Sequence, residues 1–147
     1  MVINRSAPGA KLVPILVHED VAKAIDWLCS VFGFSERLRA GAPGGPVVHA
    51  QLTIGDAAVM LGRQGAEFRP PRAGEVNQYV VVHVDDVDGH YERAQKLWCR
   101  IIQPPRDQPF GERQYTAEDL GGHRWTFSQS VADVPPEAWG AVSVKSQ

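Results

Sequence analysis

The segment "PILVHEDVAKAIDWLCSVFGF", residues 14–34, carries the plan of the whole chain, because residues 80–100, "VVVHVDDVDGHYERAQKLWCR", repeat it 66 positions later. In each copy an extended apolar run leads into an acidic pair and then into a helical pattern. A repeat of this length that occurs only twice is typical of two fused copies of one small unit, and we expect the two units to share a pocket. The same offset joins Asp20 to Asp86, Val21 to Val87, Ile25 to Tyr91, Phe32 to Trp98 and Gly55 to Gly121.

Each copy contains one amphipathic helix. In the first copy the helix should begin after Asp20, a suitable N-cap, and end at Gly33. In the second copy Asp85 or Asp86 is the expected cap. Apolar residues at three- and four-residue spacing predict the buried stripe of each helix. The stripe consists of Val21, Ala24, Ile25, Leu28 and Phe32 in the first copy, and of Val87, Tyr91, Ala94 and Trp98 in the second.

Short apolar or alternating runs predict the strands, with hairpin turns at Gly55-Asp56 and around Gly121. Residues 63–78 carry two adjacent prolines and no periodicity, so they are the expected linker. We expect a long loop at residues 104–112 and a short helix that begins at the prolines of residues 133–141. The expected strands are residues 11–18, 34–40, 47–54, 57–61, 79–84, 99–103, 113–119 and 123–129.

The composition is that of a soluble globular protein, with 44% of the 147 residues hydrophobic and 22% charged. The formal net charge of −2 gives no reason to expect nucleic acid or a membrane surface as a partner. No apolar run approaches the roughly 20 residues that cross a bilayer, and residues 1–11 do not resemble a signal peptide. Cys29 and Cys99, two thiols without a disulfide framework, indicate reduced cysteines in a cytoplasmic protein.

Residues 14–34 together with "GERQYTAEDLGGHRWTF", residues 111–127, resemble the glyoxalase / bleomycin-resistance / extradiol-dioxygenase superfamily, also called vicinal oxygen chelate proteins. The first motif is similar to the family's strand and helix ending in a Phe-Gly or Leu-Gly pair, and the second to its closing hairpin. The resemblance implies an α+β fold of two tandem βαβββ units whose sheets curl around a shared cavity. The implied organisation is a flexible N-terminal tail at residues 1–10, a domain at residues 11–130 with units 11–62 and 78–129, and a C-terminal extension at residues 131–147.

Metal-using members of this family hold the ion at four equivalent positions on the first and last strand of each unit. Carried onto this chain, these positions are Val13, Met60, Tyr79 and Thr126, and the 66-residue offset relates both pairs. None of the four is His, Glu or Asp, and their side chains are poor ligands for hard divalent ions. We therefore expect no metal and no cofactor at the family's usual site.

The hairpin turn at Gly55-Asp56 indicates which side chains face the cavity. Pairing around this turn puts His49, Gln51 and Thr53 on one face with Met60, and an all-apolar set on the other. His49 and Gln51 could form a hydrogen-bonding patch, His49 could be a general base, or His49 could have only a structural role. Of the other histidines, His18 and His90 are expected to be solvated and His123 to bond within its turn, whereas His83 shares a strand face with Tyr79.

Two functions are compatible with this set of residues. The first is a metal-free protein that binds a small organic ligand, similar to the antibiotic-sequestering branch of the family. The second is a metal-dependent lyase, isomerase or dioxygenase whose metal ligands lie elsewhere in the chain. The sequence therefore leaves open whether any reaction is catalysed. A divergent member of the family that binds another metabolite is a third possibility. The expected ligand-binding residues are His49, Gln51, Met60, Tyr79, Tyr115 and Thr126, beside an apolar wall that includes Val13 and Ile15.

Unpaired strand edges in such units also predict a homodimer. Trp139 is the candidate for covering the partner subunit, because an exposed Trp near a chain end is otherwise difficult to explain.

Overall fold

The structure is a computed structural model that describes residues 2–144. The chain divides into two compact units, which we describe separately. The first unit contains the chain up to Val76 together with Asp119–His123, and the second contains Asn77–Glu118 and the chain from Arg124 onward. The turn between the last two strands therefore belongs, by its contacts, to the first unit.

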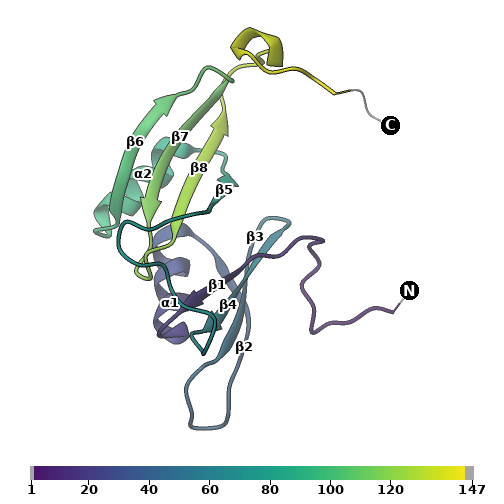
Figure 1. Ribbon diagram of the computed structural model, residues 1–147, viewed down its shortest axis with the longest axis vertical. Coiled ribbons are helices and arrows are strands. Elements are labelled where there is room, and N and C mark those ends of the chain that lie inside the picture. Colours follow the sequence, from purple (N-terminus) through teal and green to yellow (C-terminus); the bar gives the residue numbers. More distant parts are fainter. Residues whose placement is uncertain (1, 145–147) are drawn as a thin grey trace. The chain divides into compact units, whose positions relative to one another are not determined.

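The first unit is one four-stranded sheet with one helical segment (Figure 1). Its strands have the order β1-β4-β3-β2, with β1 parallel to β4 and the other neighbours antiparallel. The helix α1 packs against β3 and β4. The elements are β1 (Ile15–His18), α1 (Val21–Trp27), the π-helix η1 (Leu28–Phe32), β2 (Ser35–Ala40), β3 (His49–Ile54) and β4 (Ala57–Arg63).

The first helical segment has the limits that its sequence predicts. The Asp20 carboxylate accepts a hydrogen bond from the Lys23 backbone N–H (3.1 Å) and caps the start. Gly33, at φ 82°, ends the segment in the left-handed conformation that glycine adopts without steric cost. The last turn is a π-helix rather than an α-helix. All five residues of the predicted stripe are buried, which confirms the face that packs on the sheet.

The second unit repeats this architecture, with strand order β5-β8-β7-β6 and α2 packed against β6, β7 and β8 (Figure 1). Asp86, not Asp85, caps α2 by accepting from the Gly89 N–H (3.0 Å). The prolines near the C-terminus begin a 3₁₀-helix, as predicted. The elements are β5 (Tyr79–His83), α2 (Val87–Lys96), β6 (Arg100–Asp107), β7 (Glu112–Glu118), β8 (Arg124–Ser130) and η2 (Pro136–Trp139).

The strand registers confirm the 66-residue repeat. Ile15 pairs with Met60 in the parallel β1–β4 ladder, and Val81 pairs with Thr126 in the parallel β5–β8 ladder. Each residue of the second pair lies 66 positions after its counterpart in the first. The fold is thus two tandem βαβββ units, as expected, whereas the cavity that they were expected to share stays a prediction.

Trp98 is placed differently from its counterpart Phe32. Phe32 is 1% exposed, but Trp98 is 94% exposed and was wrongly predicted to belong to the buried stripe. The reason is that α2 ends at Lys96, so Trp98 lies beyond the helix, in a left-handed conformation with φ 61°. The following residue, Cys99, takes the buried place.

A second difference concerns the segment after α2. Residues 104–107 were expected to belong to a loop, but β6 continues to Asp107. Its register with β7 shifts between Gln103 and Arg106, at the two intervening prolines. Prolines cannot donate to a ladder, and they are tolerated here because β6 is an edge strand.

Substitutions at the two equivalent aromatic positions should have opposite consequences. Phe32→Ala should lower the free energy of unfolding by about 3–5 kcal/mol, because it leaves a cavity in the core. Trp98→Ala should change it by less than about 0.5 kcal/mol, because its side chain is solvated. Chemical denaturation of both variants measures the difference, and comparable losses would contradict the burial described here.

Candidate functional site

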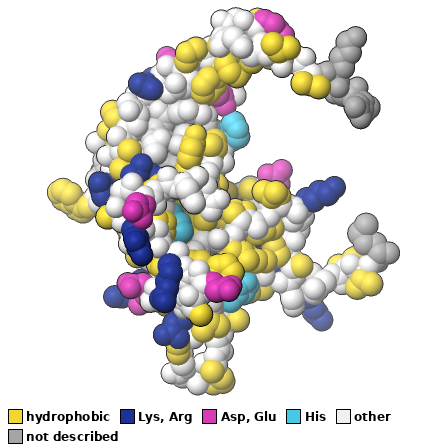
Figure 2. Space-filling model, in the orientation of Figure 1, with side chains coloured by type: hydrophobic (Ala, Val, Ile, Leu, Met, Phe, Trp, Pro, Cys, Tyr) yellow, Lys and Arg dark blue, Asp and Glu magenta, His cyan; other side chains and the backbone are white. Residues whose placement is uncertain are grey.

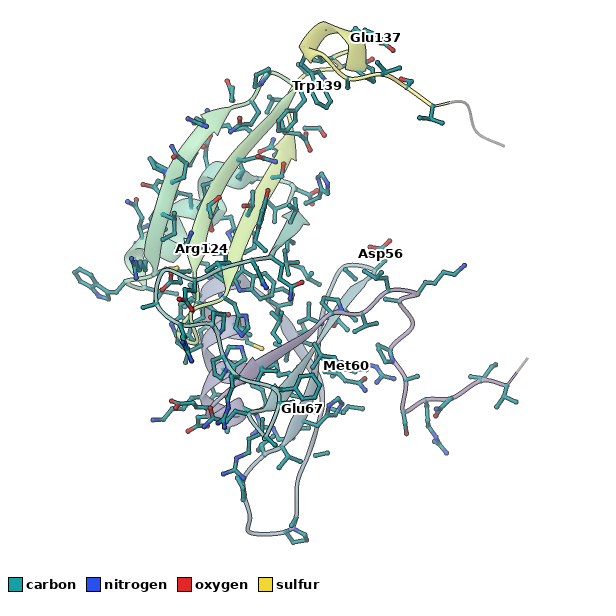
Figure 3. All side chains as sticks on the ribbon, in the orientation of Figure 1. Asp56, Met60, Glu67, Arg124, Glu137 and Trp139 are labelled. Atoms are coloured by element: carbon teal, nitrogen blue, oxygen red, sulfur yellow. The ribbon has the colours of Figure 1, made fainter. Side chains whose placement is uncertain are left out.

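The face of the first sheet that is turned away from α1 carries three of the predicted ligand-binding residues. Gln51 on β3 lies directly opposite Met60 on β4, and His49 lies opposite Gly62. Ala50 and Leu52, which alternate with them, are fully buried on the helix side. The face assignment made from the hairpin turn is therefore confirmed. Hydrophobic side chains gather over the β3–β4 part of this unit in Figure 2, and Figure 3 labels Met60 there.

A hydrogen-bond network covers part of this helix-free face. Arg37 donates from Nη1 to Gln51 Oε1, and its Nη2 donates to the backbone oxygens of Arg5 (2.6 Å) and Ala7 (3.1 Å). Gln51 Nε2 donates to the Ser6 oxygen at 2.9 Å. These bonds hold residues 5–7 of the expected tail over the sheet and leave Gln51 only 2% exposed. His49 Nε2 lies 3.5 Å from Gln51 Nε2, at the limit of a hydrogen bond.

Tyr79 and Thr126 lie on the corresponding face of the second sheet. The β5–β8 register places Tyr79 beside Arg124 and Val81 beside Thr126, on one face. Tyr79 is 64% exposed and Val81 46% exposed, so both side chains are accessible on this face. Thr126 is buried, and its hydroxyl bonds that of Thr116 at 2.8 Å.

Tyr115, in contrast, lies on the other face of that sheet, and its grouping with Thr126 was wrong. Its hydroxyl is hydrogen-bonded to His90 Nδ1, and its ring stacks on Phe127 with centroids 5.2 Å apart. Tyr91 of α2 contacts the same ring, so the side chain is fully buried beneath the helix. This burial raises the pKa of Tyr115. His90 was expected to be solvated, but it is half-buried and packs against Phe127, with ring centroids 4.0 Å apart.

A buried polar cluster in the first unit was missed from the sequence. His18 is 2% exposed, and its ring lies 4.8 Å from that of His123. His123 Nε2 is 2.7 Å from the Val17 carbonyl oxygen and donates to it, so His123 does not bond only within its own turn. The carboxylate of Asp119 accepts from the backbone N–H groups of Gly121 (2.9 Å) and His123 (3.0 Å). Strand alternation could have identified His18, because it shares the helix-facing side of β1 with Leu16.

His18 is neutral at pH 7. Burial lowers its pKa from 6.5 to about 4, opposed by the negative charge of Asp119, while His123 lowers it further. The contact of His18 Nε2 with Asp119 Oδ2, at 3.8 Å, is therefore not an ion pair at neutral pH. It is also too long for a hydrogen bond, and Nε2 has no hydrogen-bond partner among the residues that the structure describes.

The packing around His18 also fixes the turn beside it. A Cβ atom at Gly121 would lie 2.4 Å from His18 Nδ1, so only glycine fits there. A pocket of about 630 Å³ opens at this point, and His18 and Gly121 form part of its wall.

The described residues contain no group of three or more His, Cys, Asp and Glu side chains that could hold a metal ion. Of the four positions that correspond to the family's metal ligands, Val13 and Met60 are half-buried, Thr126 is bonded to Thr116, and Tyr79 is exposed.

Residues 2–144 include no helix with the length and apolar character needed to cross a membrane.

Comparison with known proteins agrees with this architecture. The model of the Glyoxalase/Bleomycin resistance protein/Dioxygenase superfamily matches residues 11–127. The chain belongs to this family. The resemblance inferred from the two sequence motifs is thereby confirmed.

Among solved structures, the chain is similar to TioX from Micromonospora sp. ML1, with 39% identity over 84% of this chain and 100% of that one and a TM-score of 0.70. An uncharacterized protein of Mycobacterium tuberculosis (strain ATCC 25618 / H37Rv) is 32% identical over 129 residues, which cover 84% of this chain and 76% of the relative. The fosfomycin resistance protein FosX from Listeria monocytogenes shares the fold at 14% identity, with a TM-score of 0.62 over 82% of this chain and 93% of that one.

Because the His18 imidazole is buried and neutral at pH 7, the stability of the protein should depend on pH. Between pH 6.5 and about 4 the unfolded chain binds a proton on His18 and the folded chain does not, so the free energy of unfolding should fall as the pH drops through this window. The loss should reach roughly 3 kcal/mol at the acid end. Denaturation at several pH values should show a flatter dependence for His18→Gln than for the wild type. A slope for His18→Gln as steep as that of the wild type would show that another group causes the pH dependence.

Proposed function

We propose that the protein binds a small organic ligand on the helix-free faces of its sheets. The observation that carries the proposal is the apolar surface that these faces leave open. Ile15 is 58% exposed on β1, and Tyr79 and Val81 are 64% and 46% exposed on β5. A sheet with one helix-covered face usually turns polar side chains to solvent on the other, so exposed large apolar residues there indicate a binding surface.

Polar groups beside this apolar surface would orient the ligand. His49, half-buried on the helix-free face of the first sheet, is the polar side chain best placed for this role. Gln51 lies beneath residues 5–7 and Thr126 is bonded to Thr116, so these two would contact a ligand only after those bonds open. Arg37 adds a positive charge next to Gln51, and the oxygens that bond it are all neutral. A mostly apolar wall with a few fixed polar groups is the usual composition of a site for an organic ligand.

We propose further that this binding needs no metal. The four positions that correspond to the family's ligands carry a valine, a methionine, a tyrosine and a threonine. Valine offers no lone pair, and a thioether or a neutral hydroxyl is a poor partner for a hard divalent ion. The alternative is a metal-dependent lyase, isomerase or dioxygenase, and metal analysis of the purified protein separates the two.

Replacing Tyr79 by alanine should weaken binding of a ligand selected from a screen of small aromatic and glycopeptide-like compounds. Loss of an anchoring aromatic side chain costs about 2 kcal/mol, which is roughly thirtyfold in affinity. Trp98→Ala, at another exposed aromatic residue of the same unit but outside the helix-free face, should leave the affinity unchanged. Calorimetric titration of the three proteins measures the effect. Equal affinities for wild type and Tyr79→Ala would contradict the role of this face.

Chelator treatment should not alter that affinity. If the purified protein instead carried near-stoichiometric zinc, nickel, manganese or iron, and lost binding or activity together with the metal, the metal-free proposal would be wrong. His49 would then be the first residue to test as a ligand.

We also propose that the protein forms a homodimer. Each sheet has two edge strands, β1 and β2 in the first unit and β5 and β6 in the second. Such edges favour pairing with another chain. Trp139, 46% exposed and in contact with Phe110, is a candidate for the interface. Analytical ultracentrifugation at micromolar concentration should give twice the 16.1 kDa mass of one chain, and a monomer would contradict this proposal.

A further inference from the structure

The pocket beside His18 is distinct from the residues proposed above, because none of them lines it. It lies in the first unit, where the segment after β4 passes the end of β1 and the start of α1. Its volume of about 630 Å³ is within the range of sites that hold small organic ligands. The lining residues are His18, Glu19, Asp20, Lys23, Gln64, Arg69, Pro70, Pro71, Arg72, Leu120 and Gly121.

The charged side chains of this pocket favour an anion. Lys23, Arg69 and Arg72 contribute three positive charges, and within the part of the chain that the structure describes none of them forms an ion pair with a carboxylate. The pocket also contains the carboxylates of Glu19 and Asp20, so three positive charges against two negative ones leave a net charge of +1. Asp20 already caps α1 by accepting from the Lys23 N–H. Guanidinium groups bind carboxylate and phosphate oxygens in a bidentate manner, and such bonds are stronger than neutral ones.

An independent observation comes from the pocket wall. The His18 side chain is 98% buried, and its Nε2 atom lacks a hydrogen-bond partner within residues 2–144. An unsatisfied buried nitrogen is costly, whereas a polar atom supplied by a ligand would remove this cost. Pro70, Pro71 and the half-exposed Leu120 supply apolar contacts in the same pocket.

The repeat shows that the fold does not require these features. The position 66 residues after Lys23 is Gly89, whereas Arg69 and Arg72 lie in the linker, which is not part of the repeat. The position that corresponds to His18 in the second copy is Val84. The second unit therefore forms its own βαβββ architecture without a counterpart of Lys23 and without the buried histidine.

We propose that this pocket binds a small organic anion. Lys23, Arg69 and Arg72 hold its carboxylate or phosphate group, and the two prolines and Leu120 contact its organic part. A turn of the His18 ring would let Nε2, which is inaccessible in the structure, bond an oxygen of the ligand. The proposal does not depend on the ligand-binding function of the helix-free faces, so either can fail without the other.

The test uses three probes that share a phenyl ring and differ in charge: phenyl phosphate, benzoate and benzyl alcohol. Each is titrated into the ¹⁵N-labelled full-length protein, and the Gln64 and Gly121 amide signals and the His18 ring nitrogens are followed by NMR. At least one of the two anions should shift these signals in a saturable way, and the alcohol should not. Which anion binds more tightly identifies the head group. Binding should also weaken as salt is added.

The double variant R69Q/R72Q should bind the anion at least about tenfold more weakly, because it loses charge-assisted hydrogen bonds. Both side chains are exposed, so the variant should fold normally. The matched control R5Q/R106Q removes two exposed arginines outside the pocket and should retain wild-type affinity. The proposal is overturned if neither anion shifts the signals, if benzyl alcohol binds as well as the anions, or if the two double variants bind equally.

Discussion

Each four-stranded sheet of this protein is covered by one helical segment on one face only, and most of its structure follows from that constraint. Side chains alternate along a strand, so every second residue of a strand goes into the core beneath the helix and the others do not. In the first unit, Ala50 and Leu52 are fully buried under α1, while His49 and Gln51 take the opposite face. Strand register therefore determines which residues are available to a ligand, and a shift of one residue would exchange the two sets.

Much of this arrangement could be predicted because it depends on local periodicity. The hairpin turn at Gly55 fixes the β3–β4 register by itself, which is why Gln51 and Met60 were correctly placed on one face. The helical stripe from Val21 to Phe32 was equally accessible, since its spacing and its cap lie close together in the sequence. The order of the strands within each sheet was not predicted, because periodicity alone does not give it.

The errors arose where packing between distant segments decides the outcome. Tyr115 was grouped with Thr126 by residue type, although the parity of their positions across the β7–β8 ladder puts them on opposite faces. Trp98 followed the helical spacing of Val87, Tyr91 and Ala94, but α2 ends before it, and the sequence contains no strong stop signal there. His18 was treated as solvated because histidine is usually exposed. Its burial depends on contacts with the turn around Gly121, about 100 residues later, which no local pattern reveals.

Packing alone does not explain the buried polar cluster that His18, Asp119 and His123 form in the first unit. The positions that correspond to His18, Asp119 and His123 in the other copy are Val84, Thr53 and Ala57. A set of small side chains without titratable groups is thus compatible with the same architecture, and it would avoid the cost of burying an imidazole and a carboxylate. The bonds that Asp119 and His123 make offset part of this cost, since they hold the turn that forms one side of the pocket. These bonds leave His18 Nε2 without a hydrogen-bond partner among the described residues, however. The stability of the turn therefore explains why Asp119 and His123 are present, but it does not explain the buried His18. A ligand in the adjoining pocket would account for it once the His18 ring turned its inaccessible Nε2 toward that pocket.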